Sequence, residues 1–182
     1  MFKALARPVL AAASFLLALS PFAASAQGNF PAFTMVSQAS GNCLTLKAPD
    51  QSDGGGLITA PCQNFPNFFV TVAGSVGEVQ LQFRLTSSHF VCVFADDNPV
   101  VSPNGQRPKV GTRNCVSPSG LGPKASMWSV RGPDNDGFQQ IEKLANNIDS
   151  SGFCMIETPT ADIELEVCQG VNTEHWKLNR VP

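Results

Sequence analysis

Gly152-Phe153-Cys154-Met155-Ile156, followed by Cys168 and Trp176, forms a pattern that occurs three times in the chain and therefore indicates how the chain folds. Each copy has an apolar segment around a first cysteine, an irregular stretch, a second cysteine and then an aromatic residue. Written in that order, the copies are Cys43, Cys62 and Phe69; Cys92, Cys115 and Trp128; and Cys154, Cys168 and Trp176. The second cysteines follow one another at intervals of 53 residues, which predicts three similar units over about residues 33–75, 79–132 and 138–180.

The repeat also predicts how the six cysteines pair. If each unit folds alike, each first cysteine bonds to the second cysteine of its own unit, as Cys43–Cys62, Cys92–Cys115 and Cys154–Cys168. None of these spacings is Cys-x-x-Cys, and the chain has only 2 histidines. We therefore expect three disulfides, no metal site and no cofactor.

The hydrophobic pattern indicates an all-β protein. The 14 prolines and 15 glycines leave little room for long helices. Residues 78–86 alternate apolar and polar, which predicts a half-buried strand. Residues 162–167 alternate in the same way, with Ile163, Leu165 and Val167 expected to face inward. Residues 138–144 fit a strand or a single helical turn, and we favour the strand.

The N-terminus predicts export. Residues 1–26 contain Lys3 and Arg7, an apolar run and a small-x-small site at Ala24-Ser25-Ala26, which is typical of a signal peptide. The apolar run is too short for a membrane span. We expect residues 27–182 to form a single domain in a secreted or periplasmic protein.

Charge and motifs restrict the function. The net charge of −2 and the 14% of charged residues do not suit a nucleic-acid-binding surface. The chain has no His-Glu-x-x-His, no Gly-x-Ser-x-Gly and no phosphate-binding glycine loop, so we expect no enzyme and no catalytic residues.

The three units resemble the ricin-B-type β-trefoil, whose repeat ends in Gln-x-Trp. The resemblance implies a β-trefoil of three disulfide-containing repeats, with Phe69, Trp128 and Trp176 as the core aromatics of the repeats. Its glutamine is replaced by Asn67, Ser126 and Glu174.

Within that group, residues 152–156 and 162–168 resemble segments of the A and C subunits of cytolethal distending toxins. This resemblance implies a non-enzymatic toxin subunit that binds a host-cell glycan or receptor. Its partners would be a nuclease-like subunit and a second trefoil subunit. The segments outside the repeats are shorter than those of the toxin subunits, which leaves a stand-alone secreted lectin as the alternative. A trefoil protease inhibitor that uses residues 100–109 is a third possibility.

The ricin-type resemblance also implies where a sugar would bind. Ricin-type sites use an Asp two residues after the first cysteine, and this chain has Thr45, Phe94 and Ile156 there. The standard galactose site is therefore absent. Asp96 and Asp97 offer a displaced site, against the alternative that they are turn residues.

Two further surfaces are candidates for a ligand or partner. Phe65 and Phe68 suggest an exposed aromatic patch, because Phe68 and Phe69 cannot both face the core of an alternating strand. Arg107, Lys109 and Arg113 belong to residues 102–131, which contain no acidic residue and suggest a basic face for sulfated glycans or an acidic partner. The alternatives are that the rings fill the core and that the charges are simply solvated.

Overall fold

The structure, a computed structural model, describes residues 31–48, 55–75, 78–85, 89–95, 105–115, 127–145 and 150–182. The predicted signal peptide and residues 100–104 lie outside them. Twelve strands and two 3₁₀ helices are found in the described residues, with the bounds β1 Ala32–Ser37, β2 Cys43–Leu46, β3 Leu57–Ala60, η1 Pro66–Phe68, β4 Val70–Ser75, β5 Glu78–Arg84, β6 Phe90–Phe94, β7 Gly111–Asn114, β8 Met127–Arg131, β9 Gln139–Leu144, β10 Ser150–Glu157, β11 Ile163–Val167, η3 Asn172–Glu174 and β12 His175–Arg180. Residues 138–144 thus supply a strand, as favoured above.

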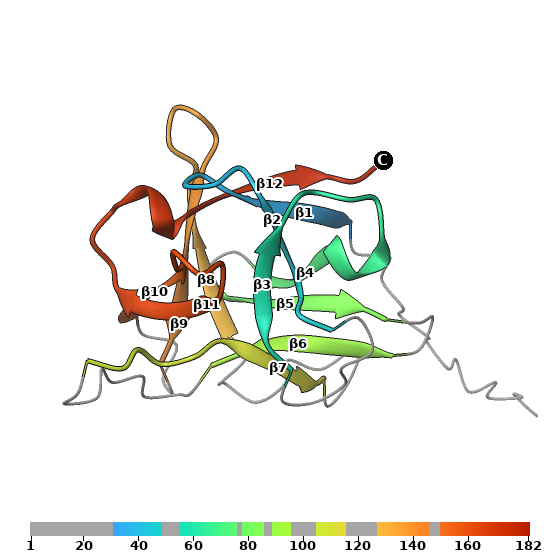
Figure 1. Cartoon of the computed structure of the whole chain (residues 1–182), viewed down its shortest axis with the longest axis horizontal. Helices are drawn as coiled ribbons and strands as arrows, with labels where there is room; N and C mark the ends of the chain where they lie inside the picture. The colour runs from blue at the N-terminus through green and yellow to red at the C-terminus, as the bar shows by residue number, and fades with distance from the viewer. Residues whose placement is uncertain are drawn as a thin grey trace, which may run out of the picture.

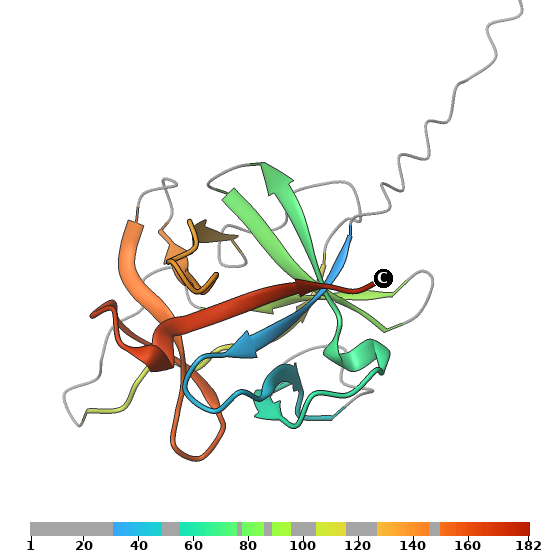
Figure 2. The same ribbon diagram turned by 90° about the horizontal axis from the view of Figure 1, so that it is seen from above.

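Six of the described strands close into a barrel. β1 pairs with β4, β4 with β5, β5 with β8, β8 with β9, β9 with β12, and β12 with β1, all antiparallel. The long pairing of β1 with β12 is visible from two sides (Figures 1 and 2). The other described strands form the hairpins β2–β3, β6–β7 and β10–β11, which pair with β1, β5 and β9. Closing the barrel removes open sheet edges.

The backbone register shows that the three units are equivalent. Strands β4, β8 and β12 each place one buried residue between two barrel strands. These residues and their backbone partners are Val70 with Phe33 and Phe83, Trp128 with Val79 and Lys143, and Trp176 with Gln139 and Ser37. On each of β1, β5 and β9, the two partner positions lie four residues apart, so one geometry is built three times.

Trp128 and Trp176 lie in the centre of the hydrophobic core, with no exposed surface. Each indole N–H donates to a backbone carbonyl, Trp128 to Val93 and Trp176 to Met155, at 3.0 Å in both cases. Val93 and Met155 each follow the first cysteine of their unit. The two tryptophans therefore occupy equivalent positions and satisfy their only polar group in the same way.

The third position of this set is Val70, and the prediction of Phe69 as the core aromatic of the first unit is wrong. Val70 is fully buried in the core, whereas Phe69 is half-buried and lies outside the core cluster. The reason is the short helix η1, after which the Phe69 N–H bonds to the Pro66 carbonyl. This places Phe69 at the position of His175 in the third unit, one residue before the buried position.

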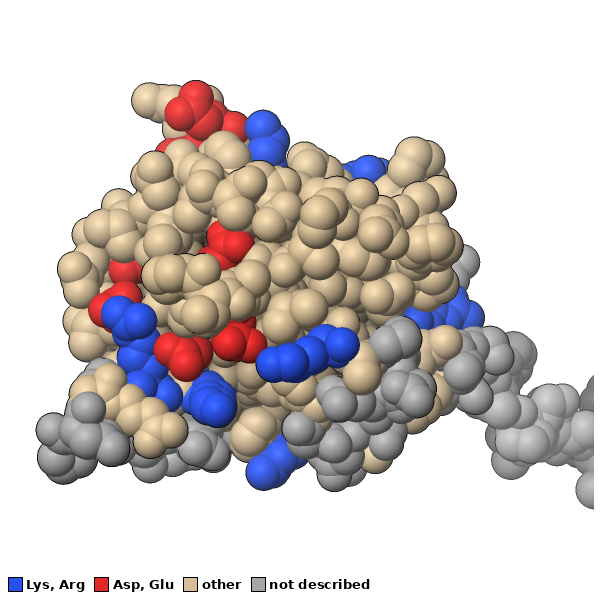
Figure 3. All heavy atoms as spheres, viewed as in Figure 1, with Lys and Arg blue, Asp and Glu red and all other residues tan. Residues whose placement is uncertain are grey.

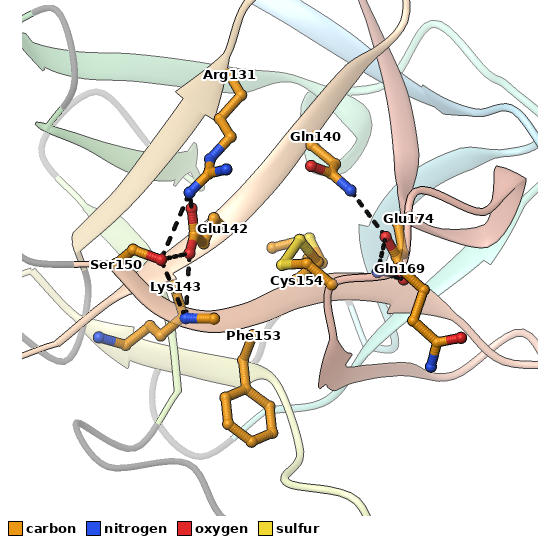
Figure 4. The surroundings of a disulfide bond; sticks show 12 residues. Arg131, Gln140, Glu142, Lys143, Ser150, Phe153, Cys154, Gln169 and Glu174 are labelled. Atoms are coloured by element: carbon orange, nitrogen blue, oxygen red, sulfur yellow. Dashed lines mark hydrogen bonds and ion pairs between the residues drawn. A yellow bond between two sulfur atoms is a disulfide. The ribbon is translucent and has the colours of Figure 1, made fainter.

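The disulfides join the cysteines of each repeat to one another. The bonds are Cys43–Cys62, Cys92–Cys115 and Cys154–Cys168. Each ties the first strand of a hairpin to the residues just after its second strand. Figure 4 shows the third bond, with the buried carboxylates of Glu142 and Glu174 on its two sides. Three disulfides are typical of a protein that folds in an oxidising compartment.

Two details of the predicted strand patterns are wrong. β5 is buried on both faces, since Gln80 and Gln82 are 1% and 5% exposed. The cause is its position in the barrel, where it pairs with β4, β6 and β8. In β11, Ile163 and Leu165 are buried as predicted, but Val167 is 51% exposed because it stands at the end of the hairpin, next to Cys168.

Candidate functional site

The three predicted basic residues come together at one pocket on the second hairpin. Arg107, Lys109 and Arg113 line a hollow of about 470 Å³, together with Phe94 from β6 and glycines from the first and second hairpins. The size lies within the usual range for ligand sites. No described acidic residue lines it. In Figure 3, Lys and Arg gather along the lower edge of this face, where Figure 1 places β7.

The register of the second hairpin brings Phe94 and Arg113 together. Phe94 pairs with Gly111, and Cys92 pairs with Arg113, so Phe94 and Arg113 are diagonal neighbours across the two strands. The Arg113 guanidinium carbon lies 3.7 Å from the centre of the Phe94 ring. This cation–π contact restrains the flexible arginine before any ligand arrives.

Glycine at 111 is needed for the close approach of two hairpins at the floor of the pocket. Gly111 forms a bridge with Gly56, and the Thr112 N–H donates to the Gly55 carbonyl at 2.9 Å. A Cβ at position 111 would lie 2.8 Å from the Gly55 oxygen, closer than real Cβ atoms come. A side chain there would force the first and second hairpins apart.

The other two cations are positioned by the third hairpin. Arg107 donates to the Glu166 carboxylate at 2.8 Å, and its side chain is 36% exposed. Lys109 is exposed and bridges Glu164 through its backbone. Glu166 offsets part of the charge of Arg107, while Lys109 and Arg113 face solvent. The arrangement suits an anionic group that accepts hydrogen bonds from Arg113 and Lys109.

The remaining predicted site residues do not join this pocket. Asp96 and Asp97 lie outside the described residues. Phe65 is 57% exposed and Phe68 is 4% exposed, so the first is a surface ring and the second is buried. Phe65 directly precedes η1, and Phe68 is the last residue of η1.

The positions at which ricin-type sites carry an Asp hold no carboxylate in the structure. Thr45 is buried, and its hydroxyl donates to the Asn67 carbonyl and accepts from the Asn67 side chain, each at 2.9 Å. Phe94 lines the basic pocket. Ile156 is buried.

A second pocket contains a residue that the sequence patterns did not single out. Glu157, at the end of β10, lines a hollow of about 340 Å³ beside the turn that follows β1. Its carboxylate is buried. A signal was present in the sequence, because Glu157 takes the place of Leu46 and Ala95, the apolar residues three positions after the first cysteine of the other units.

The part of the chain that the structure describes contains no cluster of three or more His, Cys, Asp or Glu suited to a metal ion. Among the same residues, no helix is long and apolar enough to cross a membrane.

Several solved structures match this chain over most of its length and share its fold. A designed three-fold symmetric protein, ThreeFoil, matches with a TM-score of 0.64 and 17% identity over 82% of this chain and 99% of its own. The Rhizoctonia solani agglutinin matches with a TM-score of 0.62 and 13% identity over 84% and 96%. The Macrolepiota procera ricin B-like lectin, solved with lactose, gives 0.59 and 10% over 82% and 95%. The chain is a β-trefoil.

The same fold also occurs within longer chains. A mosquitocidal holotoxin matches with a TM-score of 0.64 and 10% identity, over 85% of this chain but 18% of its own. An exo-β-1,3-galactanase from Clostridium thermocellum gives 0.62 and 12%, with 30% of its chain covered. No family model and no curated protein sequence matches.

Proposed function

We propose that this β-trefoil is an exported, non-catalytic carbohydrate-binding protein whose basic pocket binds acidic glycans. One observation carries the proposal. Arg113, held over the Phe94 ring, and Lys109 line a pocket without a described acidic residue, although the chain as a whole is net negative. The lectins among the structural neighbours make a glycan the first ligand to consider.

The chemistry of the pocket favours a sulfate group on a sugar. An arginine donates two parallel N–H bonds to such a group, and a nearby lysine adds a point charge. Because the cation–π contact already orders Arg113, less side-chain entropy is lost on binding. The three disulfides, together with the predicted signal peptide, support function outside the cytoplasm.

The test compares sulfated with unsulfated glycans. Heparin and its desulfated form are titrated into the full mature protein by calorimetry at low salt, where exposed charges act most strongly. We expect heparin to bind and the desulfated form to bind at least about tenfold more weakly, a difference of about 1.4 kcal/mol. Equal affinities would overturn the proposal.

Matched variants locate the site. Arg113→Gln and Lys109→Gln each remove one cation from the pocket and should weaken heparin binding several-fold. Lys177→Gln is the control, since Lys177 also lies over a ring, that of Phe138 at 5.5 Å, but not in this pocket. If Lys177→Gln lowered the affinity for heparin by the same factor, the effect would come from the net charge of the protein and not from the pocket.

A second candidate is the carrier subunit of a secreted toxin, as the resemblance of residues 152–168 implies. Phe65, 57% exposed beside Pro66, offers an apolar anchor for a partner subunit. The mosquitocidal holotoxin is a neighbour in which such a fold forms part of a toxin. Purification from native culture supernatant with mass spectrometry tests this role. Stoichiometric recovery of a nuclease-like chain and a second trefoil supports it, and a lone protein argues for the lectin.

A further inference from the structure

The buried carboxylate of Glu157 connects three separate strands. Ser37 of β1 donates its hydroxyl to Oε2, and Thr59 of β3 donates its hydroxyl to Oε1. Glu157 is 6% exposed, and Ser37 and Thr59 are buried as well. The carboxylate therefore lies in the protein interior with two neutral donors.

No cation compensates this charge in the part of the chain that the structure describes. The other buried carboxylates are better provided for: Glu142 forms an ion pair with Arg131, and Glu174 accepts from the backbone N–H groups of Gln169 and Gly170. An ionised carboxylate has about four acceptor positions, and the hydroxyls use two at Glu157. Burying a charge with too few donors is costly, so Glu157 is poised to accept more hydrogen bonds.

The fold does not require a carboxylate at this place. The equivalent residues of the other units, Leu46 and Ala95, are apolar and belong to the core. The glutamate therefore departs from the apolar pattern of the other two units. Such departures from the pattern of a fold are expected at functional sites.

The pocket that Glu157 helps to line has the size and lining for a small neutral ligand. Its 340 Å³ lies at the lower end of the usual range for ligand pockets. Asn42, Ser40, Thr158 and Thr173 supply polar groups, while Pro159 and Ala39 supply apolar surface. No Lys or Arg among the described residues lines it, so the described lining does not suit an anion.

We propose that this pocket binds one neutral sugar unit, with two adjacent hydroxyl groups of the sugar donating to the Glu157 carboxylate. The apolar C–H face of the sugar would cover Pro159 and Ala39. This site is separate from the basic pocket: its residues come from the turn after β1, the third hairpin and η3, and none is shared. It also differs from the ricin-type arrangement, whose Asp position is Ile156.

The test is an NMR titration of the ¹⁵N-labelled mature protein with D-galactose, D-glucose and D-mannose, which differ in the orientation of their adjacent hydroxyls. We expect at least one to shift the amide signals of Ser40, Asn42, Thr158 and Thr173 at millimolar concentration. Absence of shifts with all three hexoses would overturn the proposal. Shifts caused by methylammonium but by no hexose would also overturn it and indicate a cation site.

Three variants separate binding from stability. Glu157→Gln keeps the shape but removes the charge, and should weaken hexose binding at least about tenfold. Ala39→Trp closes the pocket from an exposed position and should abolish binding without touching the carboxylate. Ser37→Ala removes one donor to Glu157 outside the pocket lining, so it should lower Tm while hexose binding persists. Retained binding in both Glu157→Gln and Ala39→Trp would refute the site.

The two proposed glycan sites can be tested independently of each other. Arg113→Gln should leave hexose binding unchanged, and Glu157→Gln should leave heparin binding unchanged. A loss of hexose binding in Arg113→Gln would mean that the sugar occupies the basic pocket, which contradicts the proposal.

Discussion

The segments that lead into β4 and β12 share a backbone and differ in chemistry. Each is a three-residue 3₁₀ helix whose following N–H bonds back to its first residue, Phe69 to Pro66 and His175 to Asn172. The last helical residue is buried in both, as Phe68 in the first unit and Glu174 in the third.

The two units stabilise the segment that leads into the strand by different interactions. The backbone N–H of Gln169 is shared between the two carboxylate oxygens of Glu174, at 2.9 and 3.0 Å, and the backbone N–H of Gly170 donates to one of them at 2.8 Å. The side-chain amide of Gln140 donates to the same carboxylate at 2.8 Å (Figure 4). Phe68 fills the equivalent place with an apolar ring. The comparison teaches that backbone register defines the repeat, while a buried position accepts any side chain whose polar groups are satisfied.

The largest expected effect tests the register of the two units. Trp176→Ala should lower the free energy of unfolding by about 3–5 kcal/mol, because it empties the core and removes the bond to the Met155 carbonyl. Phe69→Ala should cost less than about 1.5 kcal/mol, since Phe69 is half-buried and outside the core cluster. Chemical denaturation measures both, and equal losses would restore Phe69 as the counterpart of Trp176.

This difference shows what the sequence predicts and what it does not. The cysteine spacing predicts the three repeats and the disulfide pairs, because both depend on intervals along the chain, whereas the β-trefoil follows from the resemblance to ricin-B-type repeats. The match of Phe69 to Trp176 relied on aromatic type, and residue type does not report which residue follows a 3₁₀ turn. The burial of Gln80 and Gln82 was missed because it depends on which strands pair with β5.

The two pockets differ in the same respect. The basic pocket was anticipated, since Arg107, Lys109 and Arg113 lie close together in the sequence as well as in space. The pocket around Glu157 combines the turn after β1 with the third hairpin and η3. No local pattern connects segments so far apart in the chain. The pairing of β1 with β12 and the bridge between Ile58 and Asp162 bring them together.

An intermediate effect is expected from the polar closure of the third unit. Glu174→Ala should cost about 2–3 kcal/mol, because it leaves the buried N–H groups of Gln169 and Gly170 without a partner. Glu174→Gln should cost less, since its side-chain oxygen still accepts. Thermal and chemical denaturation compare them with Glu164→Ala, a half-buried position on β11. If Glu174→Ala lowered the free energy of unfolding no more than Glu164→Ala does, the Glu174 carboxylate would not be what stabilises the segment that leads into β12.

The smallest effect concerns the residue three places before the buried position of each unit. Asn67 forms two hydrogen bonds with Thr45. Its counterpart in the third unit is Thr173, and there Ile156 replaces the threonine, so no side-chain hydroxyl is present at that position. Asn67→Ala should therefore cost about 1 kcal/mol, and Thr173→Ala less than about 0.5 kcal/mol. Denaturant titrations with replicate errors below that difference measure the contrast. The reverse order would mean that the Thr45–Asn67 pair does not stabilise the first unit.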